Sequence, residues 1–161
     1  MSANAVFTPH AKARAALAAV AFGAWGTCLW FFVPGEPSLS AFLFYLVLVI
    51  HTYFYIRCFL SIAPSGDASQ RIVDGVLIFF YLLLPLQFSN PTAFFATTAM
   101  LFLLAVGKYA LMLGEIDHLL LLRRKILVDV LGSIAVLGVL WGVLLGYAAL
   151  ASLLWLLVFS G

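Results

Sequence analysis

The chain has 161 residues, of which 66% are hydrophobic and 9% are charged, and its mean hydropathy is +1.19. Soluble domains carry about 25% charged residues, because polar groups have to cover a surface that faces water. Eight basic and six acidic side chains, with a net charge of +2, are too few for such a surface. The composition excludes a water-soluble globule and predicts an all-α, polytopic integral membrane protein. At about 20 apolar residues per span, it allows a bundle of about five transmembrane helices.

The first predicted span is residues 15–33, which follow a short basic N-terminal stretch. This apolar run ends at the Pro-Gly-Glu-Pro sequence of residues 34–37, which favours a turn. The run is longer than the hydrophobic region of a typical signal peptide. We therefore expect a retained transmembrane helix.

The second and third predicted spans are residues 40–62 and 72–89, with a Pro-Ser-Gly-Asp turn sequence at 64–67 between them. Pro85 lies inside the third span. A proline removes one backbone hydrogen bond and kinks the helix, which a membrane bundle tolerates where neighbouring groups satisfy the freed carbonyl. We expect a kink at this position.

The fourth predicted span is residues 92–114, and the polar stretch 115–125 after it is predicted to be a loop. The apolar run that follows is about 51 Å long as a helix, which exceeds the hydrocarbon core of a bilayer. We expect one span over 126–148. The remaining apolar segment, 149–161, is predicted to lie in the interface, with a short sixth span as the alternative. All spans form a single transmembrane domain.

The basic residues predict the orientation of these spans, because cytoplasmic loops carry an excess of Lys and Arg. If the N-terminus is cytoplasmic, every basic residue falls on the cytoplasmic side. The opposite loops, 34–39 and 89–91, then contain one charged residue, Glu36. We expect a bacterial inner-membrane location with the N-terminus inside. The eight basic residues are Lys12, Arg14, Arg57, Arg71, Lys108, Arg123, Arg124 and Lys125.

Small residues recur at every fourth position in the first and last spans. Steps of four stay on one helix face, so each set forms a shallow groove that lets another backbone approach closely. In lipid, such close packing drives helix association. The groove can take another helix of this chain, or a partner subunit or second copy. The predicted helix-packing residues are Ala15, Ala19, Gly23, Gly138, Gly142 and Gly146.

His51 lies at the middle of the second span, where ionisable residues are uncommon and often functional. We expect a neutral histidine that is hydrogen-bonded to a neighbouring helix, and no bound cofactor. A proton relay, or contact with a quinone or haem, is the alternative.

Four further charged residues are predicted to lie at similar depth in the cytoplasmic half of the bundle: Arg57, Asp74, Lys108 and Asp129. A short aspartate cannot extend to the interface as Lys and Arg can, so a buried aspartate needs a cation nearby. We expect the pairs Arg57–Asp74 and Lys108–Asp129, as a belt that fixes helix register. An ion or lipid-headgroup site, or contact with a partner subunit, is the alternative.

The cluster Arg123, Arg124 and Lys125 lies at a predicted exit from the membrane. Basic residues there fix topology and attract anionic lipid. A nucleic-acid partner would need far more basic surface, so none is predicted.

These features predict a non-catalytic membrane subunit of a respiratory, photosynthetic or transport complex, since no catalytic constellation is found. Its partners would be other transmembrane subunits or a second copy, with membrane lipids around them. The alternative is a small homo-oligomeric transporter or channel, whose polar path would run past His51 and the buried charges.

Overall fold

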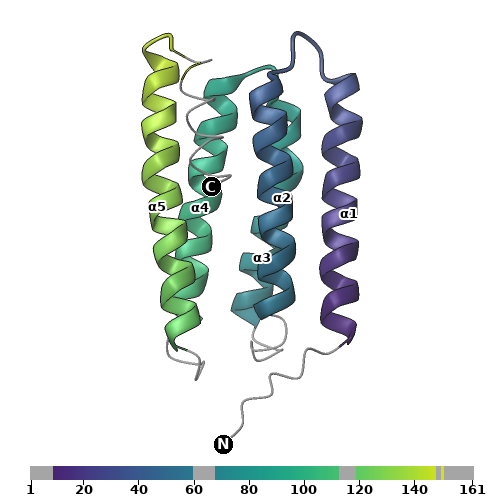
Figure 1. Cartoon of the computed structure of the whole chain (residues 1–161), viewed down its shortest axis with the longest axis vertical. Helices are drawn as coiled ribbons and strands as arrows, with labels where there is room; N and C mark the ends of the chain where they lie inside the picture. Colours follow the sequence, from purple (N-terminus) through teal and green to yellow (C-terminus); the bar gives the residue numbers. More distant parts are fainter. Residues whose placement is uncertain (1–8, 60–67, 113–118, 148–149, 151–161) are drawn as a thin grey trace, which may run out of the picture.

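The computed structural model describes residues 9–59, 68–112, 119–147 and 150. Helices joined by short turns make up this part of the chain, which contains no strand (Figure 1). Five of these helices are long and apolar enough to cross a membrane, which confirms the predicted all-α bundle. The elements are α1 (Pro9–Phe32), α2 (Leu39–Phe59), α3 (Ala68–Leu83), the 3-10 helix η1 (Leu84–Gln87), α4 (Pro91–Leu111) and α5 (Leu119–Leu144).

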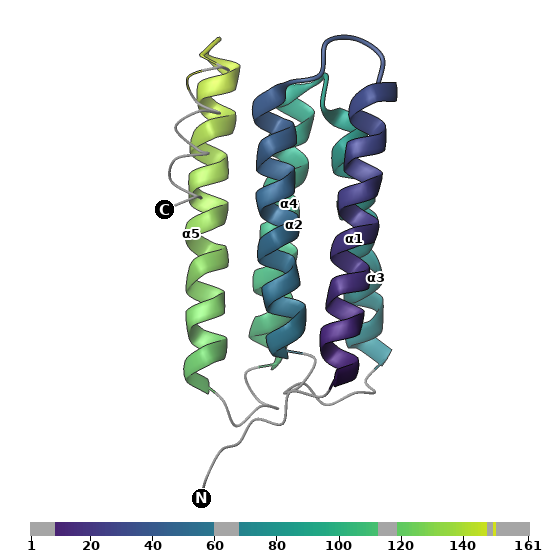
Figure 2. The same ribbon diagram turned by 45° about the vertical axis from the view of Figure 1, so that its right-hand side comes forward.

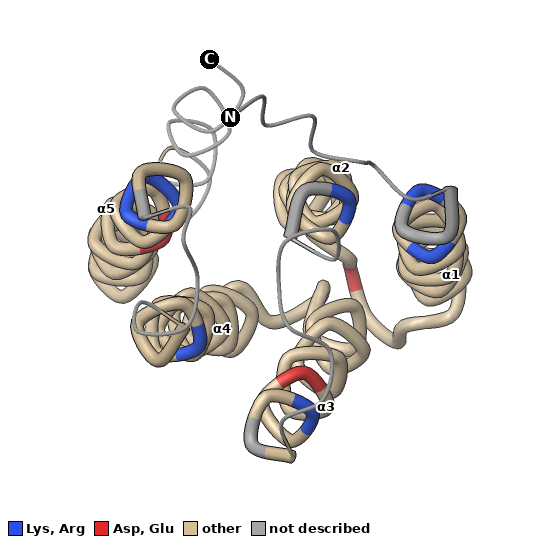
Figure 3. The backbone as a smooth tube through the Cα atoms, turned by 90° about the horizontal axis from the view of Figure 1, so that it is seen from below, with Lys and Arg blue, Asp and Glu red and all other residues tan. Residues whose placement is uncertain are grey.

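The helices run alternately up and down and lie side by side, as Figures 1 and 2 show. The most extensive packing joins α4 to α5 and α1 to α2, and α3 packs against α4 and α1. Seen from below in Figure 3, α5 and α4 lie on one side of α2, and α1 lies on the other. Residues from all five helices contribute to the main apolar core.

The helix ends follow familiar capping chemistry. Asn90 begins α4 by accepting a hydrogen bond from the Ala93 amide at 3.1 Å, with Pro91 as the first helical residue. At the end of α5, Gly146 has a φ of +89°, and the Tyr147 amide donates to the Gly142 carbonyl at 2.9 Å. This is a Schellman ending, which favours glycine because only glycine adopts positive φ without strain.

Two predicted boundaries in this region are wrong. Gly146 ends α5 and does not line a packing groove, because its backbone turns out of the helix there. The fifth helix begins at Leu119, seven residues before the predicted start, so the basic cluster of residues 123–125 lies inside a helix and not in a loop. Leu, Arg and Lys are all good helix formers, which accounts for the longer helix. Apart from Leu150, the segment 149–161 lies outside the described residues.

An aromatic cluster fills the core near the turn that contains Glu36. The Phe88 ring lies 5.8 Å from the rings of both Phe42 and Tyr45, and 5.9 Å from that of Phe94, measured between centroids. Phe88, Tyr45 and Phe94 are fully buried. Edge-on arrangements of this kind add to the stabilisation that comes from burial alone.

The two turns at this end of the bundle are hydrogen-bonded to each other. The Ser38 amide donates to the Phe88 carbonyl, and the Ser89 hydroxyl donates to the Pro34 carbonyl, both at 2.8 Å. Gly35 has a φ of +93° within the first turn. These bonds join the α1–α2 hairpin to the start of α4.

At Pro85, where a kink was predicted, α3 ends at Leu83 and continues as η1. Proline has no amide proton for the carbonyl four residues before it, so the Tyr81 carbonyl loses its helical donor. The Tyr45 hydroxyl lies 3.4 Å from that carbonyl and 3.0 Å from the Phe22 carbonyl. The Trp25 indole donates to the neighbouring Leu82 carbonyl at 3.0 Å. Side chains of α1 and α2 therefore contact the backbone carbonyls at the end of α3.

Candidate functional site

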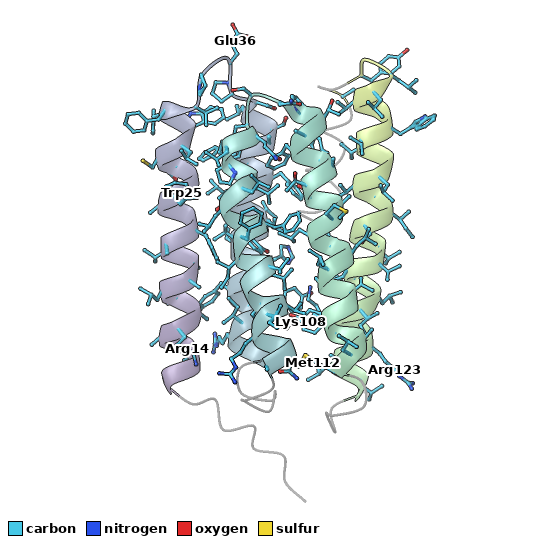
Figure 4. The ribbon with its side chains drawn as sticks, turned by 180° about the vertical axis from the view of Figure 1, so that it is seen from behind. Arg14, Trp25, Glu36, Lys108, Met112 and Arg123 are labelled. Atoms are coloured by element: carbon cyan, nitrogen blue, oxygen red, sulfur yellow. The ribbon has the colours of Figure 1, made fainter. Side chains whose placement is uncertain are left out.

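The basic side chains gather at one end of the bundle. Arg14, Lys108 and Arg123 lie at the end opposite Glu36 in Figure 4, and Figure 3 shows Lys and Arg around the helix ends seen from that side. We refer to this end as the basic end. It also holds the ion pairs of the described residues, which form the candidate site.

A buried ion pair within α5 is the centre of the site. Lys125 Nζ donates to Asp129 Oδ1, and the two residues are 8% and 1% exposed. The Lys125 ammonium also lies 3.6 Å from the centroid of the Tyr55 ring and 5.3 Å from that of Tyr109. We refer to Lys125, Asp129, Tyr55 and Tyr109 as the Lys125 site, and it joins α5 to α2 and α4.

Local sequence explains the arrangement of this pair. Residues four apart lie on one face of a helix, so Lys125 and Asp129 meet without any help from another element. The same spacing places Ser133, whose hydroxyl donates to the Asp129 carbonyl at 2.8 Å. Burying two charges costs free energy that their attraction offsets only in good geometry, and the aromatic faces of two tyrosines supply further attraction for the ammonium.

One oxygen of the site has no hydrogen bond. Asp129 Oδ2 is buried, and no donor reaches it within the part of the chain that the structure describes. The other such atom there is Gln87 Oε1, which lies in η1. A buried acceptor without a donor costs about 1–3 kcal/mol, and more if it is charged. The Lys125 site therefore offers one unused acceptor.

A second ion pair connects the site with the surface. Lys108 on α4 donates to Asp74 on α3, and the Asp74 side chain is half-exposed. Lys108 Nζ also lies 5.6 Å from the centroid of the Tyr109 ring. Tyr109 thus stands between two ammonium groups, one near the surface and one buried.

The charged residues pair differently from the prediction. Lys108 contacts Asp74, so the predicted pair Lys108–Asp129 is wrong, and Asp129 is met by Lys125 from its own helix. The cation that the structure places on Asp74 is Lys108, where Arg57 was expected. The prediction compared depths between helices and overlooked the spacing of four within α5. Arg57 is half-buried near the end of α2.

The basic cluster divides into two parts. Arg123 and Arg124 are exposed, as the prediction of a lipid-facing surface requires. Lys125 is buried and points into the bundle, so its assignment to the lipid surface is wrong. The helix turns by about 100° per residue, which separates neighbours in sequence onto different faces.

Among the described residues, the predicted small-residue positions differ in how far they pack inside the bundle. A Cβ built on Gly23 or Gly138 meets nothing within 4 Å, and Gly142 is only partly buried. Ala15 is fully buried and Ala19 partly so. Close contacts occur at two glycines outside both sets: Gly26 lies against Tyr45, and Gly132 lies against Phe102.

His51 is half-buried in α2, one turn from Tyr55. Its neighbour Thr52 is hydrogen-bonded through its hydroxyl to that of Tyr81 on α3. The described residues include no group of three or more side chains that could hold a metal ion.

The sequence analysis did not identify Tyr55 and Tyr109 as site residues. Their signal was weak, because tyrosine is an ordinary residue of apolar spans, and only the fold brings the two rings to Lys125. No protein-family model, no curated protein and no solved structure matches this chain.

Proposed function

We propose that the chain is an integral membrane protein that serves as a non-catalytic subunit of a larger membrane assembly, of respiratory, photosynthetic or transport type. It docks onto another transmembrane helix through the outer face of α5. Five helices that are long and apolar enough to cross a bilayer support the membrane location. The observation that carries the docking proposal is the position of Gly138.

Gly138 lies on α5 where no other part of the described chain covers it. Ile134 and Trp141, its neighbours on the same helix face, are also exposed. Glycine inside a helix costs about 1 kcal/mol relative to alanine, and close packing is its usual compensation. The described part of the chain supplies no such packing at Gly138. A second helix lying over Gly138 would make that contact, with the larger neighbours on either side of it.

Native mass spectrometry after purification in mild detergent tests this proposal. We expect other membrane subunits in fixed stoichiometry with the wild-type chain, and their loss in Gly138→Leu. Gly107→Leu on α4 is the matched control, because a Cβ at Gly107 also meets nothing within 4 Å. The control should keep the partners. If Gly138→Leu retains them as well as Gly107→Leu does, the docking face is not on α5.

We propose further that the basic end faces the cytoplasm, in a bacterial inner membrane. All the labelled basic residues of Figure 4 lie at that end, while Glu36 lies at the other. A bias of this kind sets the orientation of polytopic membrane proteins. Arg123 and Arg124 would then face the anionic lipid of the inner leaflet.

The Lys125 site favours a second candidate function, that of a small homo-oligomeric transporter or channel. Ionisable groups buried in membrane helices often mark ion or proton pathways. A ring composed of this chain alone, seen in the same mass spectra, would support transport and contradict the subunit proposal.

A further inference from the structure

The Lys125 site holds a carboxylate whose two oxygens are in different states. Oδ1 accepts from Lys125, whereas Oδ2 is buried without a donor. Solvent does not reach this oxygen, because Asp129 is 1% exposed. A ligand at Oδ2 would satisfy an acceptor that this part of the chain leaves unused.

The number of available oxygens decides which ligand fits. Calcium takes six to eight oxygen ligands and magnesium takes six, so one free carboxylate oxygen is a poor site for either. The described residues form no other metal-binding group at this position. A proton, in contrast, needs a single oxygen. We propose that the Lys125 site is a proton-binding site inside the bundle, and that Asp129 Oδ2 is the atom that takes up the proton.

Uptake is a simple addition. The proton forms an O–H bond with Oδ2, the carboxylate becomes a carboxylic acid, and Lys125 keeps its positive charge. Release reverses the step, and neither an electron nor a co-reactant is required. The Lys125 ammonium is still stabilised once Asp129 is neutral, because it lies 3.6 Å from the centroid of the Tyr55 ring. The aromatic face therefore allows Asp129 to change charge without leaving a bare buried cation.

The second ion pair lies beside the Lys125 site at the basic end. Asp74 is half-exposed at the basic end and is bonded to Lys108, which lies against the Tyr109 ring. The other neighbour of that ring is Lys125. The titratable and charged groups around Asp129 are Lys125 on α5, Lys108 and Tyr109 on α4, Tyr55 on α2, and Asp74 and Tyr81 on α3.

Infrared spectroscopy of a selectively labelled protein tests the proposal with all four residues of the Lys125 site in place. The chain has four aspartates, so the variant Asp67→Asn/Asp74→Asn/Asp117→Asn keeps Asp129 alone. With ¹³C in the aspartate carboxyl group, its acid and carboxylate bands report on Asp129 only. Exposed Asp and Lys side chains titrate near about pH 4 and about pH 10, so neither changes charge between about pH 9 and about pH 5.

We expect the labelled acid band to grow reversibly as the pH falls through this range, with the carboxylate band decreasing in step. Circular dichroism establishes at each pH that the helices are intact. A carboxylate band that persists over the whole range shows a permanent ion pair and overturns the proposal. An acid band that never titrates overturns it as well.

Removal of the counter-ion gives a second, independent measurement. In Lys125→Met, added to the labelled variant, the acid band should persist over the whole range, because a buried carboxylate without a cation is unfavourable. Arg124→Met, at an exposed position of the same helix, is the control and should leave the band titratable. A carboxylate that persists in Lys125→Met shows that Asp129 meets water or another cation, which contradicts the site as proposed.

Discussion

Glycine positions show where the helices of this bundle meet most closely. A Cβ built on Gly26 would lie 2.2 Å from Cε1 of Tyr45, and one built on Gly132 would lie 3.0 Å from Cε1 of Phe102. The first distance is well inside van der Waals contact. Tyr45 is also fully buried, and its hydroxyl is bonded to the Phe22 carbonyl, so its ring has little freedom to move.

We therefore expect Gly26→Ala to lower the free energy of unfolding by about 1–3 kcal/mol, the usual cost of overfilling a packed core. Gly23→Ala on the same helix should be neutral or slightly stabilising, because its Cβ meets nothing and alanine favours helix. Reversible unfolding in mixed micelles, followed by circular dichroism, measures both. Equal stabilities for the two variants would show that the Tyr45 ring can move aside at little cost in free energy.

Residue patterns in the sequence predicted some of these features and missed others. The spacing of four between Lys125 and Asp129 is visible in the sequence and is a known ion-pair spacing. The prediction instead paired Asp129 with Lys108, because it compared only charges at the same depth on different helices. The contact between Gly26 and Tyr45 has no such signal, since one glycine in an apolar helix looks like any other.

The broken third helix depends on groups from two other helices. Pro85 leaves the Tyr81 carbonyl without its regular donor, and Tyr45 and Trp25 lie within hydrogen-bonding distance of the carbonyls of Tyr81 and Leu82. In an apolar surrounding, carbonyls of this kind need a partner. The interruption of α3 at Pro85 consequently contributes to the packing of α3 against α1 and α2.

A double-mutant cycle measures this dependence. Tyr45→Phe should cost about 1–2 kcal/mol of unfolding free energy, since buried carbonyls lose a donor. In a Pro85→Ala background the cost should be smaller, because the new amide at position 85 donates to the Tyr81 carbonyl. The unfolding assay used for the glycine variants gives all four values. Equal losses of unfolding free energy in the two backgrounds would mean that the Tyr45 hydroxyl donates to the Phe22 carbonyl alone.

Hydropathy and proline chemistry were sufficient to predict the helices and the break. Both depend on local sequence: an apolar run of about 20 residues forms a helix in lipid wherever it lies, and a proline in the helix interior removes a backbone hydrogen bond. The donors at the break could not be predicted, because Trp25 and Tyr45 come from distant segments and only packing brings them there.

The whole bundle carries its basic residues at one end and Glu36 at the other. The orientation that we propose from this asymmetry places the basic end in the cytoplasm. Arg123 and Glu36 are both exposed, so each can be replaced without disturbing the core.

Cysteine labelling in intact cells measures the orientation. In a background with Cys28 and Cys58 changed to Ser, Glu36→Cys should react with a membrane-impermeant maleimide. Arg123→Cys should react only after the inner membrane has been permeabilised. The opposite pattern would place the N-terminus outside and reverse the proposed topology.

The hydrogen bonds between the two turns near Glu36 have a mechanical consequence for the bundle. They hold the α1–α2 hairpin and the start of α4 as a fixed pivot. Tyr55 of the Lys125 site lies 16 residues after the start of α2, about 24 Å from these turns along the helix axis. A tilt of α2 by about 5° at the turns would move a point at that distance by about 2 Å. A small rotation of α2 at this end would therefore become a large displacement of the Tyr55 ring at the Lys125 site.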